Sequence, residues 1–322
     1  MVSVLLEKGD VMEIVLALNS DKFIYDYLSI GVKYFVVGTK YFSCRQALSL
    51  DYQEIKELKN KIGTSKLWVL VNALIEEKNL DALSEHLKQL AALKVDGILF
   101  QDFAILQICR EENYQFELIY QPDTLNTNQA TLNYLGQQGI NGAFLAREIP
   151  LAQKQEIAQN VALKTMVQVH GVEYMAYSKR KLLTNYFNEI NHPLTVTIDD
   201  NITIQANGVD ELCHIYEDQF GCHILSKSQL CCLDILSSME PFDYLYIESL
   251  FVDDLKLVEI VNFYQDAIDS CNNNQYGKVS KELMPQLKQL TPDINYHHSF
   301  MFDNTVYKID DVRKREENEK GK

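Results

Sequence analysis

The sequence has no apolar run of the roughly 18 residues that a membrane-spanning helix requires. Glu7, Lys8 and Asp10 follow the short apolar start, so a secretory leader is not expected either. These absences predict a cytoplasmic protein without a membrane partner. Positive charge is also scarce, because 30 lysines and arginines stand against 45 aspartates and glutamates. A net charge of −15 opposes the phosphates of a nucleic acid, so an RNA-directed role requires a local basic patch.

Cysteine is infrequent and scattered, with seven residues and no CxxC pair or zinc-ligand spacing. We predict reduced, mostly buried thiols and no metal site. The sequence also lacks an HExxH motif and the glycine-rich loops that hold phosphates or dinucleotides. Ser178 is expected at a helix start and lacks the glycine pattern of a nucleophile elbow. A zinc peptidase and a serine nucleophile therefore have no visible support.

The chain does contain eight short apolar stretches separated by segments of helical periodicity. In the segment Asn79–Leu93, for example, the leucines fall on one helix face. This alternation predicts an α/β fold, a (β/α)8 TIM-like barrel, although an open doubly wound sheet would give a similar pattern. The predicted strands are Met12–Leu18, Tyr34–Gly38, Lys66–Asn72, Gly97–Phe100, Phe116–Tyr120, Gly142–Ala146, Thr165–Val169 and Tyr244–Ile247.

The alternation stops after Tyr186, where β-branched residues and turn signals follow one another. Leu194–Ile198 and Ile202–Ala206 are predicted to form a hairpin, with two more short strands at His214–Tyr216 and His223–Leu225. We expect residues 1–275 to form the barrel, with a β-rich insertion at about 190–228 before the last strand. Residues 276–322 would form a C-terminal extension, and the charged end from Arg313 a mobile tail.

The carboxyl ends of parallel barrel strands form one rim, where residues distant in sequence converge. The predicted strands place Asn72, Arg147, Glu148, His170 and Glu248 at this rim. A histidine and an arginine among carboxylates can bind a small anion or move protons. The alternative interpretation is an ordinary set of rim ion pairs, with the histidine hydrogen bonded at a strand end.

Two segments combine basic and aromatic residues just after predicted strands, namely Lys40–Arg45 and Tyr177–Lys181. Together they could form a positive patch able to stack bases and contact phosphates on an otherwise acidic protein. The alternative is that both are solvated helix starts with ordinary basic side chains.

Several motifs, in order from about residue 31 to 270, resemble the peptidase U32 family. Val169–Tyr186 is similar to the family's signature His-Gly-Ala-Leu-Cys-x-Ala-Tyr-Ser-Gly-Arg-Cys, with Tyr174 and Lys181 in place of the two cysteines. Ala146–Leu151 resembles its Ala-Arg-Glu-Leu-Ser-Leu segment. Members with the full cysteine set resemble iron–sulfur proteins, because closely spaced thiolates are common cluster ligands. This chain thus resembles a relative without the cluster.

The short, cysteine-poor form resembles the smaller member of a Gram-positive pair linked to hydroxylation of the tRNA wobble uridine to 5-hydroxyuridine. The resemblance implies a larger U32-family paralogue as partner, with the iron–sulfur cluster in that cysteine-bearing partner and no cofactor in this chain. It also implies tRNA as a partner and prephenate as a co-substrate. The alternatives are a peptidase or collagenase-like hydrolase of undefined catalytic type, and a non-catalytic scaffold subunit.

Under the hydroxylation hypothesis, nine residues are candidates for the site. Three would move protons, namely His170, Glu148 and Glu248. Six would bind substrate, namely Arg45, Asn72, Arg147, Tyr177, Ser178 and Arg180. The arginines are the natural partners of a carboxylate or phosphate, because the guanidinium group donates two parallel hydrogen bonds.

Overall fold

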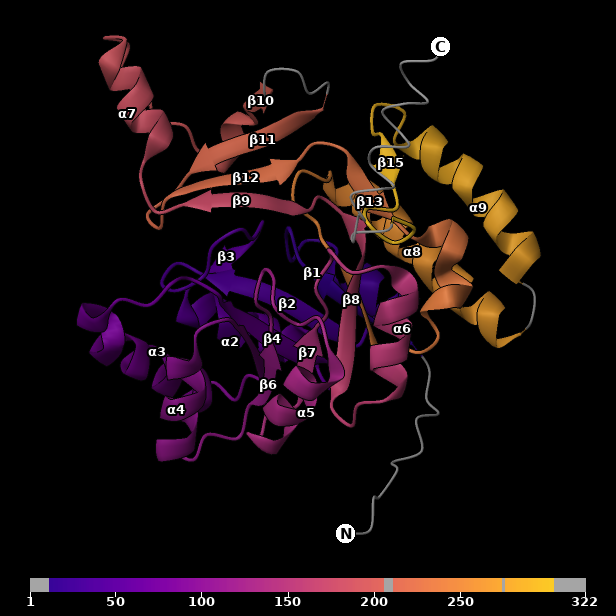
Figure 1. Cartoon of the computed structure of the whole chain (residues 1–322), viewed down its shortest axis with the longest axis horizontal. Helices are drawn as coiled ribbons and strands as arrows, with labels where there is room; N and C mark the ends of the chain where they lie inside the picture. Colours follow the sequence, from indigo (N-terminus) through magenta and orange to yellow (C-terminus); the bar gives the residue numbers. More distant parts are fainter. Residues whose placement is uncertain (1–11, 206–210, 274–275, 304–322) are drawn as a thin grey trace, which may run out of the picture.

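Eight parallel strands close into a barrel in the computed structural model, which describes residues 12–205, 211–273 and 276–303 (Figure 1). Each strand pairs with the next along the chain, and the last pairs with both the seventh and the first. The strands are β1 (Glu13–Ala17), β2 (Tyr34–Thr39), β4 (Lys66–Val71), β5 (Gly97–Phe100), β6 (Glu117–Tyr120), β7 (Gly142–Phe144), β8 (Lys164–Gly171) and β14 (Tyr244–Ile247). The predicted barrel is confirmed.

Alternating side chains of the strands point into the barrel or outward to the helices. The inward cluster includes three aromatic rings near the strand starts, Tyr34, Trp68 and Tyr244, with ring centroids 5.0 to 5.2 Å apart. The Trp68 indole donates to Glu117 Oε2 at 3.0 Å, which satisfies its N–H group. The amino-terminal end of the barrel is therefore filled by packed rings.

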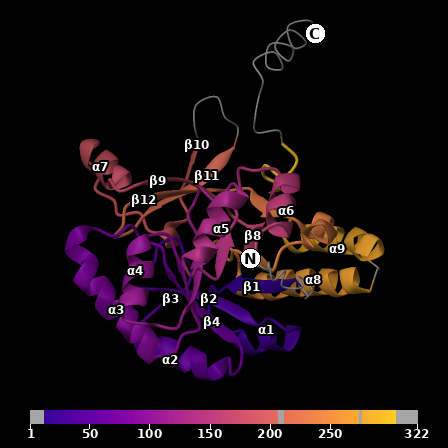
Figure 2. The same cartoon turned by 60° about the horizontal axis from the view of Figure 1, so that its bottom comes forward.

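Helices surround the barrel and bury its outer apolar face (Figure 2). They are α1 (Ile24–Ile30), α2 (Tyr52–Lys61), α3 (Leu80–Ala92), α4 (Phe103–Glu111), α5 (Gln129–Gln137), α6 (Leu151–Gln159) and α8 (Asp254–Asn272). Helix α3 matches the predicted segment Asn79–Leu93. Polar caps define several helix starts: Asp51 forms a capping box with Glu54 at α2, and Asp253 accepts two backbone N–H bonds at α8.

A small antiparallel sheet lies across the carboxyl ends of the barrel strands and is called the cap sheet here (Figure 1). Its order is β10 (Thr203–Gln205), β11 (Leu212–Glu217), β12 (Cys222–Ser226) and β9 (Tyr174–Ser178). Because the sheet precedes β14, the β-rich insertion before the last strand is confirmed. The strands predicted at His214–Tyr216 and His223–Leu225 are present and paired.

Two local predictions in this region are wrong. Leu194–Ile198 forms no hairpin with residues 202–205, because β10 pairs with β11 and a 3-10 turn occupies residues 198–200, and Ala206 of the predicted strand lies outside the described residues. Ser178 does not begin a helix, since it ends β9 and pairs with Cys222. The first error is a choice between two neighbouring partners, since β10 pairs with the strand that follows it and not with the segment before it. The second arises because β9 pairs with β12, a strand distant in the sequence, which no local pattern reveals.

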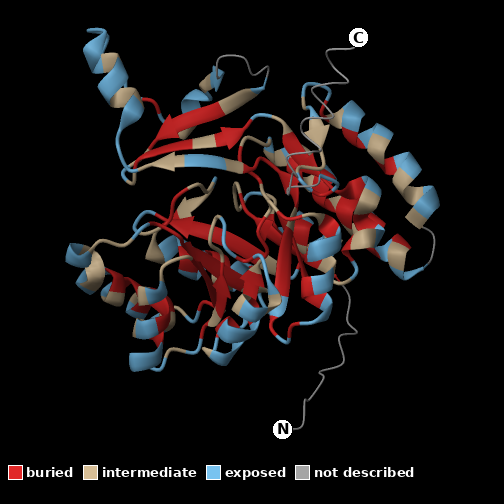
Figure 3. Ribbon diagram, viewed as in Figure 1, coloured by how far each residue is buried: buried red, intermediate tan, exposed pale blue. Residues whose placement is uncertain are grey.

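Helix α7 (Leu182–Glu189) projects from the cap sheet and has no buried residue (Figure 3). Leu183 and Phe187 on one side pack against the apolar core of the cap. At four-residue spacing on another side, Leu182, Tyr186 and Ile190 are 43%, 59% and 50% exposed. The helix thus presents an apolar stripe to solvent.

The chain after β14 adds helix α9 (Tyr276–Leu290) beside α8, followed by the short strand β15 (Tyr296–His297). Strand β13 (Gln229–Cys231) joins β15 to the edge of β8, and β3 (Ser49–Leu50) pairs with β2. The tail predicted from Arg313 lies outside the described residues. Within 12–205, 211–273 and 276–303, no helix combines the length and apolarity needed to cross a membrane.

Candidate functional site

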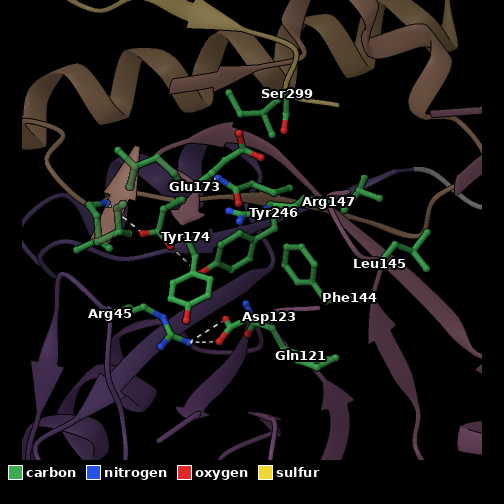
Figure 4. A pocket seen from close by; sticks show the side chains of 18 of the residues that line it. Arg45, Gln121, Asp123, Phe144, Leu145, Arg147, Glu173, Tyr174, Tyr246 and Ser299 are labelled. Atoms are coloured by element: carbon green, nitrogen blue, oxygen red, sulfur yellow. Dashed lines mark hydrogen bonds and ion pairs between the residues drawn. The ribbon is translucent and has the colours of Figure 1, made fainter. Parts of the chain in front are cut away.

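A cavity occupies the carboxyl end of the barrel, beneath the cap sheet (Figure 4). Side chains from the strand ends form its floor, while Tyr174 of β9, Leu225 of β12 and Met301 close it from above. The volume open to water is about 90 Å³, enough for several waters or a small molecule. Six acidic or basic side chains line it: Arg45, Asp123, Arg147, Lys154, Glu173 and Glu248.

Arg45 forms the main ion pair of the cavity. Its Nη2 donates to both carboxylate oxygens of Asp123, at 2.9 and 3.1 Å, and its guanidinium lies 4.5 Å from the ring centre of Tyr174. Burial raises the pKa of Asp123, although the positive charge of Arg45 opposes that shift. The pair is largely enclosed, with 9% of the Arg45 side chain exposed. It anchors one wall of the cavity.

The loop that carries Arg45 is held by Asn72 at the end of β4. The Asn72 side chain accepts from the backbone N–H of Cys44 at 2.9 Å and donates to the backbone oxygen of Cys44 at 3.0 Å. Arg45 itself has a positive φ of 57°, a left-handed conformation that costs a non-glycine residue about 1 kcal/mol. Asn72 therefore positions the arginine through the backbone.

Arg147 and Lys154 form the second positive group. The Lys154 ammonium is buried and donates to the backbone oxygen of Arg147 at 3.3 Å, and burial lowers the pKa of Lys154 to about 8. Arg147 Nε and Nη1 are buried, and neither donates a hydrogen bond within the described residues, although Nε forms an ion pair with Glu148 at 3.5 Å. Unsatisfied buried donors are costly, so these groups are suited to an anion that enters the cavity.

Glu248 lines the cavity at the end of β14. One carboxylate oxygen accepts the backbone N–H groups of Ser249 at 2.9 Å and Leu250 at 3.1 Å, and the other faces the Tyr246 hydroxyl at 3.4 Å. Burial raises the pKa of Glu248 to about 7, so both protonation states are accessible near neutral pH. Such a group can accept and return a proton.

His170, predicted to be catalytic, is not among the residues that line this cavity. The register between β8 and β14 shifts after Tyr246, so His170 is paired with Ile247 and lies on the outer face of the strand. Its ring packs 5.5 Å from Tyr264 of α8 and 5.7 Å from Tyr296, measured between centroids. Burial lowers the pKa of His170 to about 3, which keeps the imidazole neutral. Its catalytic role stays a prediction.

The structure separates the remaining predicted residues. Glu148 lies beside Arg147, 3.5 Å from its Nε, and does not line the cavity. Tyr177 faces a second depression on the rim, where its hydroxyl donates to the backbone oxygen of Phe220 at 2.6 Å. Ser178 accepts from the backbone N–H of Arg180 at 3.2 Å, and the Arg180 side chain is exposed. The cavity thus collects Arg45, Asn72, Arg147 and Glu248 of the predicted set.

Six charged or aromatic lining residues were not predicted as site residues, namely Asp123, Phe144, Lys154, Glu173, Tyr174 and Tyr246. Lys154 could have been found, because it lies on the same helix face as the apolar Leu151 and Ala158. A charge on the buried face of a helix indicates a special partner. Asp123 follows β6 within a loop, and no periodic pattern marks it.

Five of the cysteines are buried and two are partly buried, all as free thiols, as predicted for their location. Among residues 12–205, 211–273 and 276–303, no three histidine, cysteine or acidic side chains are grouped as metal ligands.

The fold and the cavity define a (β/α)8-barrel protein with a charged, capped site at the carboxyl ends of its strands. The chain belongs to peptidase family U32, whose family model matches residues 24–310. The tRNA hydroxylation protein P2 of Bacillus subtilis is 28% identical over 306 residues, covering 92% of this chain and 99% of that protein. The tRNA hydroxylation protein P1 of the same organism is 24% identical over 275 residues, covering 81% of this chain and 65% of that protein.

Solved structures with a similar arrangement include 2,3-dimethylmalate lyase, at 11% identity and a TM-score of 0.42 over 88% of each chain. The tryptophan synthase α-subunit of Pyrococcus furiosus has 12% identity and a TM-score of 0.40, covering 88% of this chain and 98% of that one. Neither likeness bears on function.

Proposed function

We propose that this chain takes part in the hydroxylation of the tRNA wobble uridine to 5-hydroxyuridine, together with a larger U32-family paralogue. The observation that carries the proposal is the similarity to tRNA hydroxylation protein P2 over nearly the whole length of both chains. The similarity to protein P1 supports the pairing, because the same organism holds both relatives. An iron–sulfur cluster in the partner would supply electron transfer.

Within this proposal, the cavity of the present chain binds a small carboxylate, with prephenate as the candidate co-substrate. Arg147 supplies buried donors without hydrogen-bond partners among the described residues, and Lys154 places an ammonium group beside them. A carboxylate would satisfy these groups with charge-assisted hydrogen bonds. Glu248, which lines the same cavity, would take or return a proton.

The exposed apolar stripe of α7 is the surface that we assign to the paralogue. Its three side chains extend away from the cap core, and exposure of this extent along one helix is typical of a protein interface. The partner would thereby lie beside the cap sheet, which closes the cavity.

The first test is the nucleoside composition of tRNA from cells without this gene, measured by mass spectrometry. We expect 5-hydroxyuridine derivatives to be lost and to return on complementation with the wild-type gene. Arg147→Ala should fail to restore them, whereas Arg110→Ala, a change of an exposed arginine on α4, should restore them. Unchanged nucleosides in the deletion strain would contradict the proposed function.

The second test is calorimetric binding of prephenate to the purified chain. Arg147→Ala should weaken binding about tenfold or more, because the carboxylate loses charge-assisted hydrogen bonds. Arg110→Ala serves as the control. Equal affinities of wild type and Arg147→Ala would remove the cavity from the proposal while leaving the tRNA role to the genetic test.

A further inference from the structure

A second depression, called the rim groove here, lies beside the cavity between the loop after β2, helix α3 and the cap sheet. Its open volume is about 570 Å³, and its walls combine aromatic rings with lysines. The two basic and aromatic segments predicted from the sequence meet in it, since Lys40, Tyr41 and Phe42 face Tyr177 and Lys179. The Gln219 side chain joins the walls by donating to the backbone oxygen of Lys40 at 2.9 Å.

Tyr41 forms an exposed platform supported from within. It stacks on Tyr52 with centroids 5.0 Å apart and an angle of 18° between the planes, yet 43% of its surface is accessible. The buried ring of His86 lies 5.5 Å from Tyr41 and its Nδ1 lies 2.8 Å from the Tyr52 hydroxyl. These contacts fix the orientation of Tyr41, so an added ring could stack at little entropic cost.

The charge of the groove differs from that of the whole protein. Lys40, Lys78 and Lys179 line it against two glutamates, Glu76 and Glu85, whereas the chain as a whole carries −15. Glu76 pairs with both Lys78, at 2.9 Å, and Lys179. The exposed Arg180 and Lys181 continue the positive run. Lys40 pairs with Glu54 at 3.6 Å, so a phosphate would share Lys78 and Lys179 with the Glu76 carboxylate that lies between them.

Three segments contribute side chains to both the groove and the cavity. The loop after β2 gives Phe42 to the groove and Arg45 to the cavity, and β9 gives Tyr177 and Tyr174 in the same way. The end of β4 contributes Asn72 to the cavity, and the chain just beyond it contributes Leu74 to the groove. An extended ligand bound in the groove would therefore run toward the neighbouring cavity.

We propose that the rim groove binds an unpaired RNA segment, with a base stacked on Tyr41 and phosphates on Lys78 and Lys179. Stacking on an aromatic ring accepts any base, because every base has a π face, and lysines contact the backbone without reading sequence. The inference rests on the proposed function in taking the segment to be the anticodon loop of a tRNA.

The test uses a fluorescein-labelled anticodon stem-loop RNA with uridine at the wobble position, titrated with the full chain and followed by anisotropy. Tyr41→Ala should weaken affinity about tenfold, the loss of one stacked base, and Tyr41→Phe should retain wild-type affinity. Tyr134→Ala, a change of an exposed tyrosine on α5, is the matched control. The assignment would be overturned if Tyr41→Ala bound the RNA as tightly as wild type does. It would also be overturned if Tyr41→Ala and Tyr41→Phe lost affinity equally, or if the wild-type chain formed no detectable complex with the RNA.

The phosphate-binding role of the lysines is tested by the salt dependence of the same binding. Lys179→Glu should lower the slope of log affinity against log salt by about 0.7 for each phosphate that the variant no longer neutralises, whereas Lys281→Glu, the same charge change on α9, should not. A slope unchanged by Lys179→Glu would overturn the assignment. The genetic test remains separate: retained 5-hydroxyuridine in the deletion strain refutes the tRNA role, whereas loss of RNA affinity without loss of modification refutes only the groove.

Discussion

Glu248 and His170 come from similar rim positions in the sequence, yet the structure gives them different environments. Glu248 faces the cavity with a pKa near 7, and His170 is enclosed on the outer side of its strand. The sequence predicted that both follow strand ends, because apolar runs mark strands. It could not predict the register shift beside Tyr246, which reverses the direction of one side chain.

Glu248 should make stability depend on pH. The folded pKa of about 7 exceeds the ordinary value of 4.5, so between these values the folded protein holds a proton that the unfolded chain releases. The free energy of unfolding should therefore fall as pH rises through this range, by at most about 3 kcal/mol. Glutamine has the shape of the protonated glutamate side chain but does not titrate, so the stability of Glu248→Gln lacks this pH dependence. In urea unfolding, the variant should therefore gain stability relative to wild type between about pH 5 and pH 8.

The control for this prediction is Glu112→Gln, a change of an exposed glutamate, whose difference from wild type should be the same at both pH values. Parallel pH profiles for wild type and Glu248→Gln would show that the carboxyl group is already charged throughout the range.

At the scale of elements, all eight barrel strands were predicted within a few residues, because each is a short buried run between helical segments. The cap sheet was predicted less well. Its strands pair across as many as about fifty residues, as β9 does with β12, and one edge strand was assigned to the wrong partner. The difference is physical: a buried parallel strand is marked by its own apolarity, whereas half-exposed strands depend on neighbours.

Gly171 at the end of β8 should be intolerant of a side chain. Its φ is +98°, and an added Cβ would overlap the backbone of Glu248 and lie 2.8 Å from the Glu248 Cβ. Gly171→Ala should therefore lower the free energy of unfolding by about 3 kcal/mol or more. The matched control is Gly63→Ala, where φ is +60° and no atom lies within 4 Å, so about 1 kcal/mol is expected. If urea unfolding gave equal losses of unfolding free energy for Gly171→Ala and Gly63→Ala, the protein would accommodate the added methyl group beside Glu248 at no extra cost.

At the scale of the whole molecule, α7 exposes an apolar stripe that, among the described residues, packs against neither the barrel nor the cap sheet. Changing Tyr186 and Ile190 to serine removes two of the three stripe residues and leaves the cap-facing Leu183 and Phe187 intact. After co-expression with the larger paralogue, the double variant should no longer co-elute with it in size-exclusion chromatography, whereas Tyr134→Ser should. If the double variant still co-eluted with the paralogue, the interface would lie elsewhere on the chain. If the chain alone self-associated through α7, the stripe would bind a second copy of this chain and not the paralogue.

The cap sheet leaves and rejoins the barrel at one place. The chain departs after Gly171 and returns at Leu230, and these two residues are paired across β8 and β13. An insertion whose ends already lie side by side adds little strain to its host, because the junction is the same whatever its length. Recombination could therefore exchange this module for another without rebuilding the eight strands. In such a family, substrate choice can diversify while the barrel is inherited unchanged.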